Sequence, residues 1–151
     1  MAIRMKTTVT MRPTATAVSH SRTDVAVRDT SIIIDEPLER DGTNLGPSPT
    51  ETAIASLIAC TNTIGHKCAD KLGIDLGAVT FAAQVSFDRR GVTLAEEIDV
   101  PFPDITLTVT ARSDASAEDL IRVGQETAKY CPIAKVFQAA GTDLTVLWEK
   151  G

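Results

Sequence analysis

The chain has 151 residues, of which 43% are hydrophobic and 23% are charged, and its net charge is −5. These values are typical of a soluble globular domain that buries a core without disulfide staples, so we predict a single domain covering residues 1–151. Because no segment concentrates Lys and Arg into a basic stripe, the composition argues against nucleic acid as a partner.

No stretch approaches the roughly 18 consecutive apolar residues that a membrane span requires, and residues 1–11 lack the apolar core of a secretory signal. We therefore expect a cytoplasmic protein without a membrane partner. Cys60, Cys68 and Cys131 are an odd number of cysteines with no CxxC pair among them. In a reducing compartment this pattern indicates buried, catalytic or redox-active thiols in preference to structural cross-links.

The first 37 residues predict a β meander of two or three strands, because short runs rich in β-branched residues alternate with polar turns. The loop LERDGTNLGPS, residues 38–48, follows. The strand segments are TTVTM at 7–11, TATAVS at 14–19, TDVAVRD at 23–29 and TSIIIDEP at 30–37.

A long helix is predicted to begin at the sequence SPTE. Ser48 and Glu51 form a capping-box pattern, Pro49 occupies the first helical position, and no strong breaker follows until Gly73. The helix would contain about 24 residues and extend about 36 Å. Its first half is small and apolar nearly all round, so we expect other elements to enclose it.

The second half of the chain predicts a sheet and two further helices. Period-two patterns at 79–87, 92–100 and 104–112 indicate a three-stranded antiparallel sheet. An amphipathic helix over 114–130 is interrupted before Pro132, a short helix reaches Gly141, and a strand over 142–150 closes the chain. The fold class is α+β: an N-terminal β meander, a long buried helix, an antiparallel sheet, a helix pair and a final strand.

The three cysteines differ in their surroundings. A free cysteine usually packs as a small hydrophobe, and this interpretation suffices for Cys68, which is too far along the helix from Cys60 to form a disulfide with it. Cys131 lies before Pro132, at the N-terminus of the following helix, where free N–H groups favour a thiolate and would depress its pKa. A simple kink that packs two helix segments explains this position equally well.

Other polar residues carry weaker signals. Glu51 suffices as a capping residue, and its azimuth on the helix is roughly opposite that of Cys60, so a link between them needs a third group. Arg22 is the candidate, ahead of Arg12 and Arg28. His66 and Cys68 do not indicate a metal site, because side chains two residues apart on a helix diverge and cannot both bind one ion.

Two segments together resemble the OsmC/Ohr superfamily of osmotically inducible and organic hydroperoxide resistance proteins. GPSPTETAIASLIACTNT, residues 46–63, resembles the helix start that leads to the first cysteine of the family. PFPDITLTVTARSDASAEDLIRVGQETAKYCPIAKVF, residues 101–137, resembles the segment that carries the second. The resemblance extends over roughly residues 8–150 and implies an OsmC-like fold in which the two cysteines meet in space.

The resemblance implies thiol-dependent reduction of organic hydroperoxides in oxidative stress defence, with Cys60 as the peroxidatic and Cys131 as the resolving cysteine. Arg22 and Glu51 correspond to the residues that hold the first cysteine as a thiolate. In the hydroperoxide-resistance branch Glu directly follows the proline, whereas here Thr50 does, as in the OsmC-like branch. Neither a metal nor a flavin cofactor is implied, and an external dithiol would reopen the disulfide.

A pocket lined by Leu57, Ile58 and Ile64 would favour alkyl hydroperoxides over hydrogen peroxide, because each buried methylene contributes about 0.8 kcal/mol. The resemblance also implies an intertwined homodimer with two active sites at its interface. Two alternatives remain: a non-catalytic protein of this fold that binds a small apolar ligand, and a thiol redox sensor that oxidises without turnover.

Overall fold

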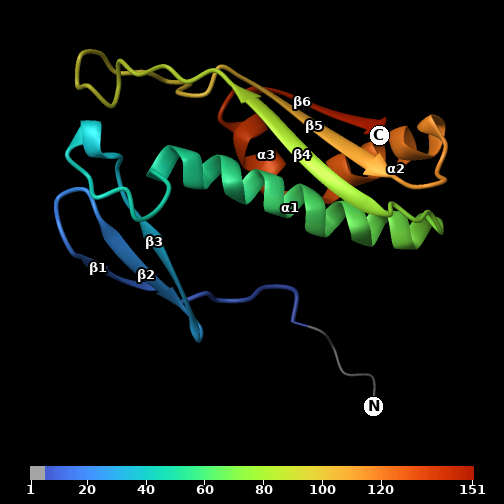
Figure 1. The fold of residues 1–151 in the computed structure, drawn as a ribbon, viewed down its shortest axis with the longest axis horizontal. Coiled ribbons are helices and arrows are strands. Elements are labelled where there is room, and N and C mark those ends of the chain that lie inside the picture. The colour runs from blue at the N-terminus through green and yellow to red at the C-terminus, as the bar shows by residue number, and fades with distance from the viewer. Residues whose placement is uncertain (1–5) are drawn as a thin grey trace. The chain divides into compact units, whose positions relative to one another are not determined.

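A computed structural model describes residues 6–151 of the chain (Figure 1). Residues 1–5 lie outside the described residues. The prediction that residues 1–11 are not a secretory signal therefore falls partly outside the described chain. The chain divides into two compact units that meet in the sequence between Ala53 and Ile54. That residues 1–151 form a single domain stays a prediction. The elements are β1 (Thr14–Ala17), β2 (Thr23–Val27), β3 (Thr30–Ile34), the 3-10 turn η1 (Leu38–Arg40), α1 (Pro49–Leu72), β4 (Ala78–Val85), β5 (Asp104–Arg112), α2 (Ala117–Tyr130), α3 (Pro132–Ala139) and β6 (Asp143–Lys150).

The N-terminal unit contains the predicted meander. β1, β2 and β3 form an antiparallel sheet in that order, with Thr14 opposite Ala26 and Val27 opposite Thr30. The prediction of a strand at 7–11 was wrong. These residues have β-branched side chains, but in the described part of the chain no strand pairs with them. Strand propensity alone leaves the backbone N–H and C=O groups without partners.

The loop that follows β3 is organised around a buried carboxylate, which belongs to Asp35. Its Oδ2 accepts hydrogen bonds from the Thr43 hydroxyl at 2.5 Å and from the N–H groups of Thr43 and Leu45, both at 3.1 Å. Its Oδ1 accepts from the N–H of Glu36 at 2.8 Å. The Thr43 hydroxyl and these N–H groups stabilise the ionised form and lower the pKa of Asp35 to about 2.

α1 begins and ends where the sequence predicts. The Ser48 N–H donates to Glu51 Oε2 at 2.8 Å and the Glu51 N–H donates to Ser48 Oγ at 3.3 Å, which confirms the capping box. The helix contains 24 residues and ends before Gly73, whose φ of 70° is the left-handed conformation typical of a helix C-terminus.

The sheet of the C-terminal unit is mixed, which corrects the prediction of three antiparallel strands. β4 pairs antiparallel with β5, but the third strand is β6, which runs parallel to β5 (Figure 1). Residues 92–100 form a loop instead of a strand. The Arg90 guanidinium binds Asp88 at 2.7 Å and Glu96 at 2.7 Å, and Leu94 has a φ of 58°, so the chain here turns back on itself. The α2–α3 pair supplies the crossover that parallel strands need.

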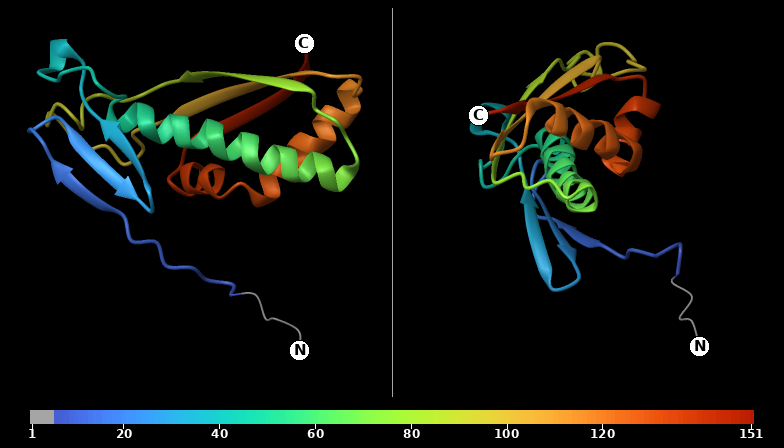
Figure 2. Two further views of the ribbon diagram at one scale, coloured as in Figure 1. Left: turned by 60° about the horizontal axis from the view of Figure 1, so that its bottom comes forward. Right: turned by 90° about the vertical axis from the view of Figure 1, so that its right-hand side faces the viewer.

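The core of this unit lies between the sheet and its helices (Figure 2). Alternate residues of β5, including Leu107 and Val109, are fully buried, as the period-two pattern predicts. Trp148 of β6 packs between Gly65 of α1 and Gly124 of α2: a Cβ on either glycine would lie 2.6 Å or 2.5 Å from the indole ring. Among the described residues, no helix has the length and apolarity to cross a membrane.

The structure differs from the expected enclosure of the first half of α1. Leu57 is completely buried, but Ala55, Ser56 and Ala59 are exposed on the described chain. The helix therefore buries one face against its own unit and presents a face of small residues to its surroundings.

Candidate functional site

Cys60 lies on α1, between its buried and its exposed faces. Its neighbour Ala59 is exposed and Thr61 is only 2% exposed, whereas Cys60 itself is partly accessible. A thiol in this position remains within reach of a small molecule from solvent while the rigid helix fixes its direction.

Cys131 lies at the break between α2 and α3. Its N–H donates to the Thr127 carbonyl at 3.0 Å, and Pro132 begins α3 immediately afterwards, as the sequence predicts. Its backbone is extended (φ −68°, ψ 106°), and the residue is only 1% exposed. The cysteine is thus the N-cap of α3 and is almost completely enclosed.

The expected depression of the Cys131 pKa was wrong. Burial, which disfavours the thiolate, raises the pKa of Cys131, and the nearby Cys60 raises it further. The backbone N–H groups of Ala134 and Ile133 lower it, as expected at a helix N-terminus, but the effect of burial is larger. Cys131 is therefore held as the neutral thiol at neutral pH.

The structure brings Cys60 and Cys131 together, although 70 residues separate them in the sequence. Cys60 is one of the groups that raise the pKa of Cys131, which places the two thiols close to one another. Both cysteines are reduced, and so is Cys68. Cys68 is eight residues further along α1 and is only 4% exposed. One accessible and one buried thiol that lie close together form a pair that can be oxidised to a disulfide.

Glu51 lies in the N-terminal unit as the capping residue of α1. The Ser48 N–H bonded to its carboxylate and the nearby Ser48 hydroxyl lower the pKa of Glu51, and the nearby charge of Arg40 lowers it further. Arg40 also pairs with Glu36 at 3.1 Å. This arginine was not predicted as a neighbour of Glu51, because the 38–48 loop brings the two residues together.

Arg22 forms a bidentate ion pair with Asp24, from Nε to Oδ1 and from Nη2 to Oδ2, both at 2.8 Å. Asp24 is two residues further on, at the start of β2. Arg12 and Arg28 are both exposed, and Arg28 has a φ of 58° in the turn between β2 and β3. A role for Arg22 at Cys60 stays a prediction.

The three aliphatic residues predicted to line a substrate pocket occupy different environments. Leu57 is completely buried in the core of its unit, whereas Ile58 and Ile64 are partly accessible. The Nδ1 of His66 forms a hydrogen bond with the Asn62 carbonyl at 3.0 Å. Among the described residues, no group of three or more His, Cys, Asp or Glu side chains could hold a metal ion.

A cavity of about 110 Å³ adjoins Cys131 inside the C-terminal unit. Its wall combines apolar groups with two buried hydroxyls and the single indole of the chain. These polar residues were not predicted as part of a site. The pattern that could have indicated them is a threonine next to Cys60 and another threonine four residues before Cys131. The lining residues are Thr61, Gly124, Thr127, Ala128, Cys131, Ala134, Gln138, Leu144, Val146 and Trp148.

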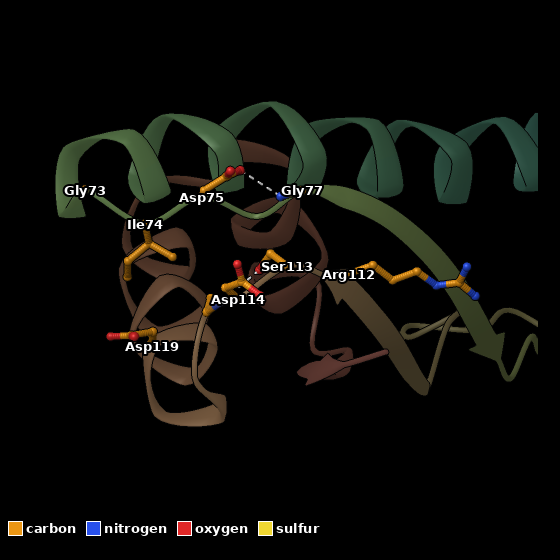
Figure 3. A pocket seen from close by; sticks show the side chains of 9 residues that line it. Gly73, Ile74, Asp75, Gly77, Arg112, Ser113, Asp114 and Asp119 are labelled. Carbon is orange, nitrogen blue, oxygen red and sulfur yellow. Dashed lines mark hydrogen bonds between the residues drawn. The ribbon is translucent and has the colours of Figure 1, made fainter.

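A larger and more open pocket, of about 540 Å³, lies where α1 ends and α2 begins (Figure 3). Asp75, Asp114 and Asp119 contribute carboxylates, and Arg112 comes from the end of β5. Two of these carboxylates are used structurally. Asp75 Oδ1 accepts from the Gly77 N–H at 2.9 Å, and Asp119 accepts from the Ser116 hydroxyl at 2.9 Å and from the Arg122 guanidinium at 3.0 Å. The pocket contains no thiol, so it does not share the chemistry of the cysteine pair.

The fold and the paired thiols define a class of protein, and a family comparison identifies it. The model of the OsmC-like protein family matches residues 42–146, which is more than half of the chain. The chain therefore belongs to the OsmC-like protein family, as the two cysteine segments predict. No curated protein sequence matches this chain.

Solved structures show the same fold at low sequence identity. The OsmC-like protein from Mycoplasma pneumoniae superimposes with a TM-score of 0.78 and 17% identity over 94% of this chain and 97% of that one. An organic hydroperoxide resistance protein from Elizabethkingia anophelis gives 0.70 and 16%, covering 97% of this chain and 100% of its own. The organic hydroperoxide resistance protein OhrB of Bacillus subtilis gives 0.65 and 19%, covering 93% and 98%.

Proposed function

We propose that this protein is a thiol-dependent peroxidase that reduces organic hydroperoxides through Cys60 and Cys131. The observation that carries the proposal is the proximity of a partly accessible and a buried thiol from distant parts of the chain. Membership of the OsmC-like family supports it, as do similar folds among proteins named for organic hydroperoxide resistance.

The difference in exposure supports the two proposed roles. Cys60 is the accessible thiol, so as a thiolate it attacks the terminal oxygen of ROOH; the O–O bond breaks, ROH leaves after taking up a proton, and Cys60 becomes a sulfenic acid. Cys131 is enclosed and held neutral, which protects it from direct oxidation. Its sulfur then attacks Cys60, the S–O bond breaks, and water leaves as the disulfide forms.

A dithiol must complete the cycle, because the disulfide carries the two oxidising equivalents taken from the peroxide. The dithiol attacks one sulfur, releases both cysteines as thiols and leaves as its own disulfide. Ile64 is partly accessible one helical turn after Cys60, on the same face of α1, which supports an alkyl hydroperoxide as substrate. Ile58 is also partly accessible, but it is two residues from Cys60 and lies on a different face. Glu51 and an arginine, Arg22 or Arg40, are the candidates to stabilise the Cys60 thiolate.

The test is consumption of cumene and tert-butyl hydroperoxides, against hydrogen peroxide, by purified protein with dithiothreitol. Wild type is expected to prefer the organic peroxides, Cys60→Ser to lose turnover, and Cys131→Ser to accumulate a sulfenic acid that a dimedone probe labels. Cys68→Ser is the matched control and should retain activity, because that thiol lies apart from the pair. Wild-type consumption no faster than that of Cys60→Ser would refute the peroxidase and favour a ligand-binding protein.

A further inference from the structure

The indole N–H of Trp148 has no hydrogen-bond acceptor among the described residues. This is the single tryptophan of the chain, and it is only 8% exposed. A buried N–H without a partner is uncommon in folded proteins, and an ordered water usually supplies the missing acceptor. Trp148 therefore indicates a place where the protein holds a small polar molecule.

The edge of the indole that carries the N–H lies next to Gly124, and both residues line the cavity beside Cys131. A Cβ on Gly124 would lie 2.5 Å from Cδ1 and 3.0 Å from Nε1 of Trp148, and Gly124 lines the cavity. The six-membered ring of the indole, at Cη2 and Cζ2, lies next to Gly65, which does not line the cavity. The cavity volume of about 110 Å³ is sufficient for one or more water molecules.

Two further polar groups complete the site. Thr61 and Thr127 are 2% and 3% exposed and line the same cavity from α1 and α2. Each hydroxyl already donates to a carbonyl four residues earlier, Thr61 to Leu57 at 2.9 Å and Thr127 to Val123 at 2.7 Å. Each oxygen can then only accept further hydrogen bonds. A water that accepts from the indole and donates to both hydroxyls makes three bonds, the usual number for a buried water.

We propose that this cavity binds an ordered water between Trp148, Thr61 and Thr127, and that this water carries the Cys131 proton away during disulfide formation. The second half of the proposal rests on the peroxidase function. Trp148, Thr61 and Thr127 act through the water and are positioning residues.

The chemical step balances without another reactant. The Cys131 thiol gives its proton to the bound water as its sulfur bonds to Cys60, and the S–O bond of the Cys60 sulfenic acid breaks. The departing hydroxide takes up the proton that the bound water releases and leaves as water, so the bound water is regenerated. The wall around Cys131 includes no charged side chain, so an enclosed neutral thiol needs such a relay. The water supplies a proton acceptor within a wall that is otherwise largely apolar.

The first experiment asks whether the water is present and does not depend on peroxidase activity. A high-resolution crystal structure of the reduced protein should show density within hydrogen-bonding distance of Trp148 Nε1. In the double variant Thr61→Val, Thr127→Val, methyl groups replace both acceptors and the density should disappear. The fluorescence of the single tryptophan should shift to shorter wavelength in the same variant. An empty cavity in wild type, or unchanged density in the double variant, would overturn the proposal.

Thr63→Val is the matched control. Its hydroxyl also donates to a carbonyl four residues earlier, that of Ala59 at 3.1 Å, but the residue is exposed and does not line the cavity. Trp148→Phe is a second variant, which keeps an aromatic ring at this position and removes the donor together with part of the indole volume. This variant should reduce the occupancy of the water, and it serves as the test if the double variant does not fold.

The second experiment follows one turnover without reductant. Oxidation of Cys60 should proceed at the wild-type rate in the double variant, while conversion of the sulfenic acid to the disulfide slows about 100-fold, a typical effect of losing a proton-transfer group. The solvent deuterium isotope effect on disulfide formation should also change, which a purely structural defect would not cause. A water that is present but whose loss leaves this step unchanged would refute the relay. A wild-type protein that forms no sulfenic acid would refute the peroxidase instead.

Discussion

Two glycines decide how closely the helices approach Trp148. At Gly65 a Cβ would lie 2.6 Å from Cη2 of the indole, and at Gly124 it would lie 2.5 Å from Cδ1. Real side-chain contacts do not become this short, and a buried ring has little freedom to move. The helical stretches around both glycines therefore tolerate the conformational cost of glycine in return for contact with the ring.

Replacing Gly65 by Ala should destabilise the protein. Overpacking in a core costs about 1–3 kcal/mol, which exceeds the roughly 1 kcal/mol that Ala gains over Gly in a helix. Gly91→Ala is the control, because its nearest neighbour would be 3.8 Å away. Urea unfolding should show a lower midpoint for Gly65→Ala alone. Equal midpoints for the two variants would mean that α1 shifts away from the sheet without cost.

The thiol of Cys131 makes disulfide formation dependent on pH. Burial raises the pKa of Cys131, so the fraction present as thiolate increases only as the pH rises above the ordinary range for cysteine. We expect the rate of disulfide formation in a single turnover to increase with pH across the neutral range and above. Rapid-quench sampling with mass spectrometry measures it, and Cys68→Ser should reproduce the wild-type profile. A rate that falls as the pH rises would contradict this assignment of roles.

At the scale of elements, the loop between β3 and α1 depends on Asp35. Its carboxylate accepts hydrogen bonds from Glu36, Thr43 and Leu45, so one ionised side chain fixes the path of the chain between β3 and the capping box. The capping residues follow closely, Ser48 three residues and Glu51 six residues after Leu45. The start of α1 is thus positioned by the same loop.

Asp35→Asn should lower stability at neutral pH, because it removes the negative charge that these donors stabilise. The folded pKa of about 2 lies below the ordinary 3.8, so the contribution is complete above about pH 4 and disappears as the pH falls through 2. Thermal unfolding by circular dichroism should therefore show a gap between wild type and variant that closes on acidification. Asp29→Asn, in the exposed turn before β3, is the control. A gap independent of pH would point to lost packing instead of lost charge.

At the scale of the whole molecule, α1 presents Ala55, Ser56 and Ala59 to the surroundings of the described chain. Small side chains permit close packing of a second helix, and a long helix whose first half carries so few polar groups is seldom left in water. The homodimer implied by the family resemblance would cover this face, beside the partly accessible Cys60.

Ala59→Glu should therefore convert a dimer into a monomer of 16.1 kDa, because it places a charge in the contact. Ala117→Glu adds the same charge at the exposed first residue of α2 and should leave the mass unchanged. Light scattering coupled to size exclusion measures both. A wild-type protein that runs as a monomer would exclude this use of the face.

Local patterns in the sequence determined most elements of this protein. The capping box at Ser48 and Glu51, the break before Pro132 and the alternation in β5 depend on neighbours within a few residues, so they could be predicted without the fold. The prediction at 92–100 failed because alternation alone does not show whether a partner strand is available. Family membership could be predicted because the two cysteine segments carry specific residues in a specific order.

Only the tertiary structure decided what depends on contacts between distant segments. It brought Cys60 to Cys131, and it enclosed Cys131 so thoroughly that desolvation outweighs the helix N-terminus and raises its pKa. It also placed Thr61, Thr127 and Trp148 around one cavity, although they come from three different elements. No periodic pattern in the sequence predicts which remote residues are buried or lie close together. Burial and proximity arise from how the elements pack, not from the order of the residues within each element.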